Sequence, residues 1–181
     1  ERAEGIYEIR LHNQDLGVSE VKIFLIPGKP GERSLMIDTG FGNEECFGRL
    51  KKGMEELGIS FGQLDVFITH LHHDHSGLAG VFAREGARIW MNPKEEHHAY
   101  DCIIQKRGIQ SIQEQEQVLK RVGITRKLEP GLWSKYNEVN KRVQQGQDWY
   151  FLAPDFPYEP VHQGDRFCYG PYAFEAVELK G

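Results

Sequence analysis

The residues with the clearest capacity for chemistry lie in one short stretch rich in histidine. This stretch reads Thr69-His70-Leu71-His72-His73-Asp74-His75-Ser76-Gly77. It directly follows the apolar run Val66-Phe67-Ile68, which is typical of a buried strand. Neutral imidazole nitrogens and carboxylate oxygens are common ligands of Zn²⁺ and related divalent ions. If the backbone stays extended, His70 and His72 point the same way. A turn can then bring Asp74 and His75 to a second position beside the first, so the spacing predicts a metal site.

The alternative interpretation is a polar loop whose histidines lie at the protein surface. The context favours the metal site, because a predicted buried strand precedes the cluster and a predicted helix that starts at Gly77 follows it. His73 occupies the variable place in the pattern and is expected to point away from the metal. The remaining histidines have no fixed partners, and a solvent-facing role is expected for each of them. These are His12, His97, His98 and His162.

The pattern His70-x-His72-x-Asp74-His75 resembles the HxHxDH signature of the metallo-β-lactamase superfamily, which includes glyoxalase II-like and lactonase-like hydrolases. Asp38, which follows another apolar run, is similar to the strand-end aspartate that supports the metal loop in that family. The resemblance implies an α/β fold, an αββα sandwich with two metal ions between its sheets. Zn²⁺ is the expected metal, with Fe or Mn as alternatives. His70 and His72 would bind the first ion, and Asp74 and His75 the second.

The loop supplies two ligands to each metal, whereas a catalytic zinc site normally has three protein ligands and a water. In the family the missing ligands come later, in a Gly-His-Thr-x-Gly-His element, a bridging Asp and a final His. Residues 177–181 resemble the strand and glycine that lead into that element. We therefore expect the domain to be truncated at its C-terminus and inactive as this fragment alone. The alternative is a divergent site that uses His97, His98 or His162.

The composition indicates one globular domain over residues 1–181, with a net charge of -5 and 39% hydrophobic residues. The mild acidity argues against nucleic acid as a partner, since phosphate contacts need clustered Lys and Arg. No apolar run approaches the ~20 residues needed to cross a bilayer, so no membrane partner is expected. Cys46, Cys102 and Cys168 form no CxxC pair, which favours reduced thiols in the cytoplasm. A small-molecule substrate is expected, and a homo-oligomer is left open.

Strands alternating with helices predict a layered α/β fold. Strands are expected at residues 7–11, 21–26, 35–37, 66–68 and 88–91, with a hairpin at 166–169 and 172–179. Helices are expected from the cap Asn43 to Gly58 and over residues 77–84.

A helical insertion is predicted over residues 93–156 and is expected to cover one side of the metal cleft. Asn92-Pro93 is a good cap and first helical position, and Ser111-x-x-Glu114 is a capping box. Some of the aromatic residues of the insertion are candidate walls of a substrate pocket, although packing is the simpler role for each one. These are Trp133, Tyr136, Trp149 and Tyr150.

These features together favour a metal-dependent hydrolase that uses a metal-activated hydroxide. The family resemblance and the absence of a basic stretch imply a thioester, lactone or related ester as the substrate. Asp74 would bind metal and also accept a proton during catalysis. One alternative is an iron-dependent oxidoreductase resembling the persulfide dioxygenases, and another is a metal-dependent nuclease of the same fold. Di-iron members of the family commonly carry a carboxylate where this chain has His72, which favours the hydrolases.

Overall fold

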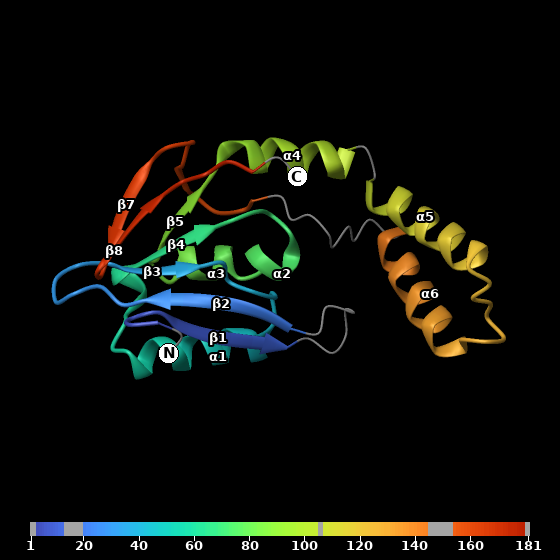
Figure 1. Cartoon of the computed structure of the whole chain (residues 1–181), viewed down its shortest axis with the longest axis horizontal. Coiled ribbons are helices and arrows are strands. Elements are labelled where there is room, and N and C mark those ends of the chain that lie inside the picture. The colour runs from blue at the N-terminus through green and yellow to red at the C-terminus, as the bar shows by residue number, and fades with distance from the viewer. Residues whose placement is uncertain (1–2, 13–19, 105–106, 145–153, 180–181) are drawn as a thin grey trace.

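A six-stranded mixed sheet forms the centre of the computed structural model, which describes residues 3–12, 20–104, 107–144 and 154–179 (Figure 1). The strands follow one another in sequence order across the sheet: β1 (Tyr7–His12), β2 (Glu20–Ile26), β3 (Ser34–Ile37), β4 (Leu64–Ile68), β5 (Arg88–Met91) and β6 (Glu159–Pro160). Strands β1 to β3 pair antiparallel, and β3 to β6 pair parallel. Because β3, β4 and β5 run parallel, the segments that follow them emerge at one edge of the sheet.

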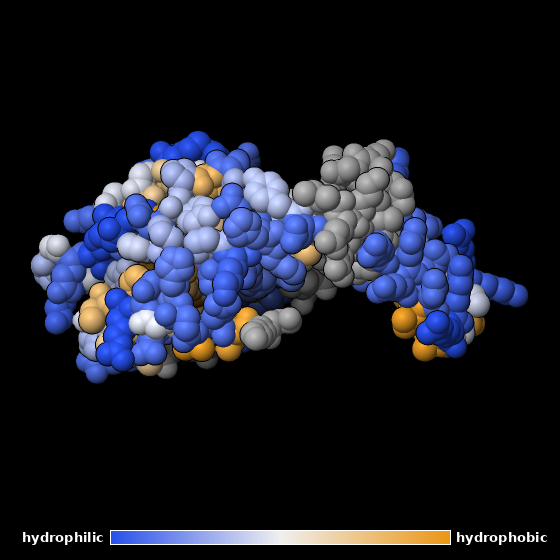
Figure 2. All heavy atoms as spheres, turned by 90° about the horizontal axis from the view of Figure 1, so that it is seen from above, coloured by the Kyte–Doolittle hydropathy of each residue, from blue (hydrophilic) through white to orange (hydrophobic). Residues whose placement is uncertain are grey.

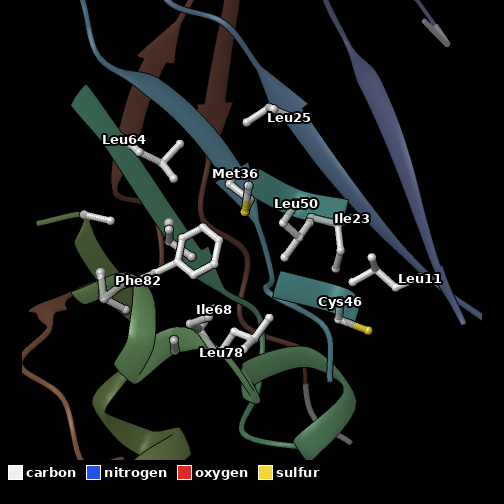
Figure 3. Packing of buried hydrophobic residues seen from close by; sticks show 14 of the residues in the cluster. Leu11, Ile23, Leu25, Met36, Cys46, Leu50, Leu64, Ile68, Leu78 and Phe82 are labelled. Carbon is white, nitrogen blue, oxygen red and sulfur yellow. The ribbon is translucent and has the colours of Figure 1, made fainter. Parts of the chain in front are cut away.

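Three helices cover one face of this sheet, namely α1 (Glu44–Glu56), the short α2 (His73–Ser76) and α3 (Ala79–Arg84), and a single 3₁₀ turn spans Phe61–Gln63. The predicted start of α1 is confirmed, since the Asn43 side chain accepts the Cys46 N–H at 2.8 Å. Gly58 follows the helix with a φ of 69°, a conformation that glycine adopts without strain. The helices and the sheet bury one continuous apolar core, in which Met36, Leu50 and Phe82 are almost inaccessible to solvent (Figure 3).

A two-stranded antiparallel sheet, β7 (Arg166–Tyr169) and β8 (Tyr172–Glu175), packs on the other face of the central sheet. The core between the two sheets is smaller and contains Leu35, Phe67 and Phe167. This order of helices, large sheet and second sheet confirms the layered α/β class predicted from the sequence. The predicted extension of the last strand to Leu179 is wrong, because beyond β8 the Glu178 N–H binds the Gln163 side chain at 2.6 Å instead of a strand partner.

The predicted helical segment forms α4 (Pro93–Ile104), α5 (Arg107–Arg121) and α6 (Pro130–Gln144). Helix α4 lies along the sheet, whereas α5 and α6 pair with each other and project away from the rest of the molecule (Figure 1). Some of the exposed apolar side chains of the chain belong to this pair and to the turn between its helices, as the orange patch in Figure 2 illustrates. They are Val118, Val122, Leu128 and Leu132. Within the described ranges, no helix is both long enough and apolar enough to cross a membrane.

The aromatic residues of the helical pair pack against each other and do not face a substrate cleft. Trp133 is 4% exposed and meets Tyr136 edge-on with ring centroids 5.4 Å apart. The Tyr136 hydroxyl donates to Glu116 at 3.1 Å, which joins α6 to α5. The expectation that Trp133 and Tyr136 form pocket walls is therefore replaced by a packing role, while Trp149 and Tyr150 lie outside the described residues.

A buried carboxylate ties the two sheets together at the edge where the parallel strands begin. Asp65 is 1% exposed and accepts hydrogen bonds from Arg33 Nε at 2.6 Å, Arg88 Nη2 at 2.6 Å and the Tyr169 hydroxyl at 2.7 Å. Burial alone would raise the pKa of Asp65, but the hydrogen bonds from Arg88, Tyr169 and Arg33 outweigh it and lower the pKa. Asp65 therefore stays ionised and connects β4 to β5 and to the hairpin.

We expect Asp65→Ala to lower the free energy of unfolding by about 3 kcal/mol, because it leaves two guanidinium groups and a phenol without their shared partner. The measurement is urea unfolding followed by circular dichroism. A matched control is Glu175→Ala, which breaks the exposed pair with Arg166 and should cost less than about 1 kcal/mol. Equal losses in the two variants would contradict a special role for the buried carboxylate.

Candidate metal centre

Asp38 stands at the point where β3 leaves the sheet and supports the histidine loop from behind. It is 5% exposed and has a φ of 62°, a left-handed conformation that aspartate tolerates better than most residues. Because β3 and β4 are parallel neighbours, Asp38 lies beside the first residue after β4. Its Oδ1 accepts the Thr69 N–H at 2.8 Å, and its Oδ2 accepts the Thr69 hydroxyl at 2.8 Å and His75 Nδ1 at 2.7 Å.

The backbone after Asp38 binds the backbone at the end of the histidine loop. Thr39 donates its N–H to the His75 carbonyl at 2.6 Å, and Gly77 donates to the Gly40 carbonyl at 2.9 Å. A Cβ atom on Gly77 would lie 2.4 Å from the nitrogen of Gly42, so only glycine allows the two segments to approach this closely. Helix α2, which carries Asp74 and His75, is fixed against the end of β3 by these contacts.

The structure brings the predicted ligands together. The ring centroid of His70 lies 4.5 Å from that of His72 and 4.1 Å from that of His75. His75 Nε2 lies 3.6 Å from Asp74 Oδ2. The ring of His73 instead lies 5.8 Å from that of the buried Phe41.

Hydrogen bonds to Asp38 determine which nitrogen of each imidazole remains available. The carboxylate can only accept, so His75 Nδ1 carries the proton of that bond and Nε2 keeps its lone pair. The Thr69 hydroxyl gives its single proton to Asp38 and therefore accepts from His70 Nδ1 at 3.0 Å. His70 and His75 thus both present Nε2 as a free donor atom, the tautomer that metal-bound histidines adopt when a carboxylate supports them.

The protonation of His70 and His72 also suits metal binding. Burial, together with the nearby His75 and His72, lowers the pKa of His70 to about 4. Burial likewise lowers the pKa of His72. For His75 the effect of burial is outweighed by the hydrogen bond and charge of Asp38 and by Asp74, so its pKa is raised. His70 and His72 are therefore neutral at pH 7, which is the form that binds metal.

An open cleft of about 740 Å³ lies in front of His70 and His72. One wall is the first part of α4, and the other is formed by the segments on either side of the small sheet. The first wall consists of Asn92, Lys94, Glu95 and His98, and the second of residues 161–163 and 176–179. Asp74 and His75 are partly buried beside the two lining histidines, with side chains 14% and 28% exposed.

His98 and His162 are exposed to solvent as expected, and both also line this cleft. Both are exposed, but the surface they occupy is shared with His70 and His72. The sequence did contain a signal for His98. Because β5 is parallel to β4, a helix that starts directly after β5 must begin beside the metal loop, and its first turns must face the same space.

The residues present fit a divalent ion in donor type and protonation. Neutral imidazoles with free Nε2 atoms and an adjacent carboxylate are the donors that zinc prefers. In the part of the chain that the structure describes, however, no three His, Cys, Asp or Glu side chains are grouped as a ready-made set of metal ligands. The described residues therefore do not by themselves complete a coordination sphere.

A comparison with protein families decides the classification. Residues 16–170 match the family model described as the metallo-beta-lactamase superfamily. The chain belongs to this superfamily. A search among curated proteins found no match.

Solved structures with the metallo-β-lactamase fold resemble this one at low sequence identity. A metallo-beta-lactamase family protein from Thermus thermophilus is 19% identical with a TM-score of 0.59, and the match covers 97% of this chain and 52% of that one. A beta-lactamase domain protein from Burkholderia ambifaria is 18% identical with a TM-score of 0.60, covering 97% and 47%. The subclass B3 metallo-beta-lactamase BJP-1 of Bradyrhizobium japonicum is 17% identical with a TM-score of 0.51, covering 96% and 48%. The chain thus spans about half the length of these relatives, and at such identities they support the fold alone.

In the metal-free protein we expect His70 and His75 to titrate far apart, because burial dominates at His70 whereas the direct hydrogen bond and charge of Asp38 outweigh burial at His75. His70 should titrate at about pH 4 and His75 above pH 6.5. The pKa of His70 is lower in the folded protein than in the unfolded chain. Its contribution to the free energy of unfolding is therefore lost as the pH drops from about 6.5 to about 4. The contribution of His75 has the opposite sign and is lost as the pH rises through its folded pKa. NMR titration of the imidazole Cε1 protons measures both values, and titration of the two rings together near pH 6.5 would contradict this electrostatic account.

Asp38→Asn should invert the tautomer of His75. The amide oxygen must stay with the Thr69 N–H, so the NH₂ group would face His75 Nδ1 and convert it into an acceptor. Nε2 would then carry the proton and lose its capacity to bind metal, and we expect metal affinity to fall by about tenfold to a hundredfold. Nitrogen-15 chemical shifts of the imidazole report the tautomer, and a zinc titration reports the affinity. Unchanged shifts with unchanged affinity would overturn the role given to Asp38.

Proposed function

We propose that this protein is a metal-dependent hydrolase acting on a small acyl compound, namely a thioester, a lactone or a related ester. The observation that carries the proposal is the pair of hydrogen-bonded connections from Asp38, one direct to His75 and one through Thr69 to His70. Both connections leave Nε2 free on imidazoles that have gathered at one point. Membership of the metallo-β-lactamase superfamily supports a metal-dependent hydrolase in general terms.

In this proposal His70 and His72 hold one ion, and Asp74 and His75 hold the other. Zinc is the metal best suited to this mixture of imidazole and carboxylate donors. When bound, such ions make water nucleophilic at neutral pH and polarise a carbonyl oxygen. Asp74, whose carboxylate lies beside His75 Nε2, would accept the proton released as the nucleophile attacks. Asp38 and Thr69 would keep His75 and His70 in the tautomer that the reaction requires.

The cleft supports a small-molecule substrate. Its volume of about 740 Å³ falls within the range typical of small-ligand sites, ~300–1,000 Å³. Apolar side chains such as Ile68, Val161 and Val177 could accommodate an acyl group, while Lys94 and Gln163 at the rim could bind polar parts. The mild net acidity of the chain, -5, favours such a ligand over a polynucleotide.

Asp74→Asn should abolish hydrolysis in the intact protein without unfolding it. We expect turnover to fall by at least about a hundredfold, the usual contribution of a positioned proton acceptor, with little change in the melting temperature. The assay is a panel of thioesters, lactones and esters, run after the metal content of protein purified without added metal has been determined. Asp101→Asn on the exposed face of α4 is the matched control and should retain full activity.

Three results would count against the proposal. Equal turnover in Asp74→Asn and the wild-type protein would remove Asp74 from the reaction. Redox-active iron combined with oxygen consumption would point to an oxidoreductase. Salt-sensitive binding and cleavage of RNA would point to a nuclease.

A further inference from the structure

The projecting pair of α5 and α6 carries an apolar patch at the end where the two helices are joined. Four aliphatic side chains there are between 43% and 68% exposed, and they contribute to the orange patch on the pair in Figure 2. They come from the last turn of α5, the connecting turn and the first turn of α6. Exposed aliphatic side chains that gather in this way often mark a contact with a partner. The four residues, called the tip patch below, are Val118, Val122, Leu128 and Leu132.

Backbone hydrogen bonds give this tip a defined shape. Gly123 follows α5 with a φ of 76°, and the Ile124 N–H then donates to the Leu119 carbonyl at 2.9 Å, which closes the end of the helix. The Thr125 carbonyl accepts the Leu128 N–H at 3.1 Å and turns the chain towards α6. The tip patch is therefore carried by an ordered turn and by the helix ends on either side of it.

Other side chains make the contacts that join α5 to α6. Trp133 is 4% exposed, and the Tyr136 hydroxyl donates to Glu116 across the pair at 3.1 Å. The guanidinium carbon of Arg126 lies 5.3 Å from the centre of the Trp133 ring. The tip patch lies outside these contacts, so its apolar surface is available to a partner.

The tip is basic, although the chain as a whole is acidic. Residues 118–132 contain four Lys or Arg and one Glu, a local net charge of +3, whereas the whole chain has a net charge of -5. The 15 residues of α5 span about 22 Å, more than twice the Debye length of about 8 Å at physiological ionic strength. The negative charge on the rest of the molecule is therefore largely screened at the tip. The basic residues, all exposed, are Lys120, Arg121, Arg126 and Lys127.

This combination of charge and apolar surface limits the partners that fit the tip. Contact between the tips of two copies would bring like charges together. Single-stranded nucleic acid binds to exposed aromatic rings, whereas the tip patch is aliphatic. A helix that docks in a protein groove needs an apolar stripe over several turns, but the positions one turn before Val118 are the exposed, polar Glu114 and Gln115. An anionic bilayer surface fits best, since its headgroups attract Lys and Arg and its acyl region accepts Val and Leu.

We propose that the tip of α5 and α6 is a membrane-contact site, at which the tip patch enters the headgroup region of an anionic lipid surface and the basic side chains bind the lipid phosphates. The expectation from the sequence that no membrane partner is involved rested on the lack of a spanning segment, which a surface contact does not need. The proposal does not depend on the metal centre or on the reaction proposed for it.

Co-sedimentation of the intact protein with lipid vesicles tests the electrostatic part of the proposal. We expect binding to phosphatidylcholine vesicles that contain about 30% phosphatidylserine, and binding at least about tenfold weaker to pure phosphatidylcholine or at high salt. Arg121→Gln combined with Lys127→Gln should lower the partition coefficient by about tenfold or more, since both cations lie near the anionic surface. Lys22→Gln combined with Lys51→Gln removes the same charge from exposed positions on β2 and α1, and this matched control should bind as the wild type does.

The apolar part is tested by Val122→Ser combined with Leu128→Ser, which leaves the charge unchanged. We expect about tenfold weaker binding to the anionic vesicles and, because both side chains are exposed, almost the same melting temperature. The proposal is overturned if the wild-type protein does not bind the anionic vesicles, if the matched control loses as much binding as the tip variant, or if the serine variant binds as tightly as the wild type. A wild-type dimer that the serine substitutions convert to a monomer would overturn it in favour of self-association. Binding to poly-L-glutamate without binding to the vesicles would overturn it in favour of an acidic protein.

Discussion

The structure depends on the buried carboxylate of Asp38. It lies at the end of β3 in a left-handed backbone conformation that only a few residue types tolerate. From that position its two oxygens bind the first residue after β4 and a histidine of α2. One side chain thus determines where the histidine loop starts, where α2 lies and which nitrogen of each ring remains free. Replacing it changes the backbone, the loop and the tautomers at the same time, because all three depend on the same two atoms.

A second buried aspartate shows how its partners give a carboxylate a different role. Asp65 lies at the opposite end of β4, where the parallel register places it beside Arg88. Two guanidinium groups and a phenol neutralise its charge and lower its pKa, so it is a fixed element that joins the two sheets. Asp38 instead accepts hydrogen bonds from a backbone N–H, a hydroxyl and an imidazole. Asp65, at the start of the parallel strands, therefore stabilises the fold, whereas Asp38, at their end, supports the candidate metal site.

Much of this arrangement could be predicted from the sequence, because the informative patterns are local. The strand-loop spacing predicted the gathering of His70, His72 and His75, and the hydrophobic periodicity predicted α1 and most strands within about two residues. Features that depend on distant contacts were missed. Trp133 could equally well have packed on the sheet, lined a cleft or joined two helices, and only the pairing of α5 with α6 decides among these roles. The early end of β8 has a similar origin, since the Glu178 N–H, three residues after the strand, binds the side-chain amide of Gln163.

The wall of the cleft that α4 forms was harder to predict from the sequence than the histidine motif itself. A ligand cluster encoded within six residues is visible as a pattern, whereas Glu95 and His98 reach the same space only because β5 runs parallel to β4 and α4 starts immediately after it. Strand direction is a tertiary property, and it determines which helix starts face the metal loop. Once the sheet order is known, the first turn of α4 becomes the natural place for groups that contact a substrate in the cleft. The same reasoning places Asn92 and Lys94 at the cleft, since they occupy the same helix start.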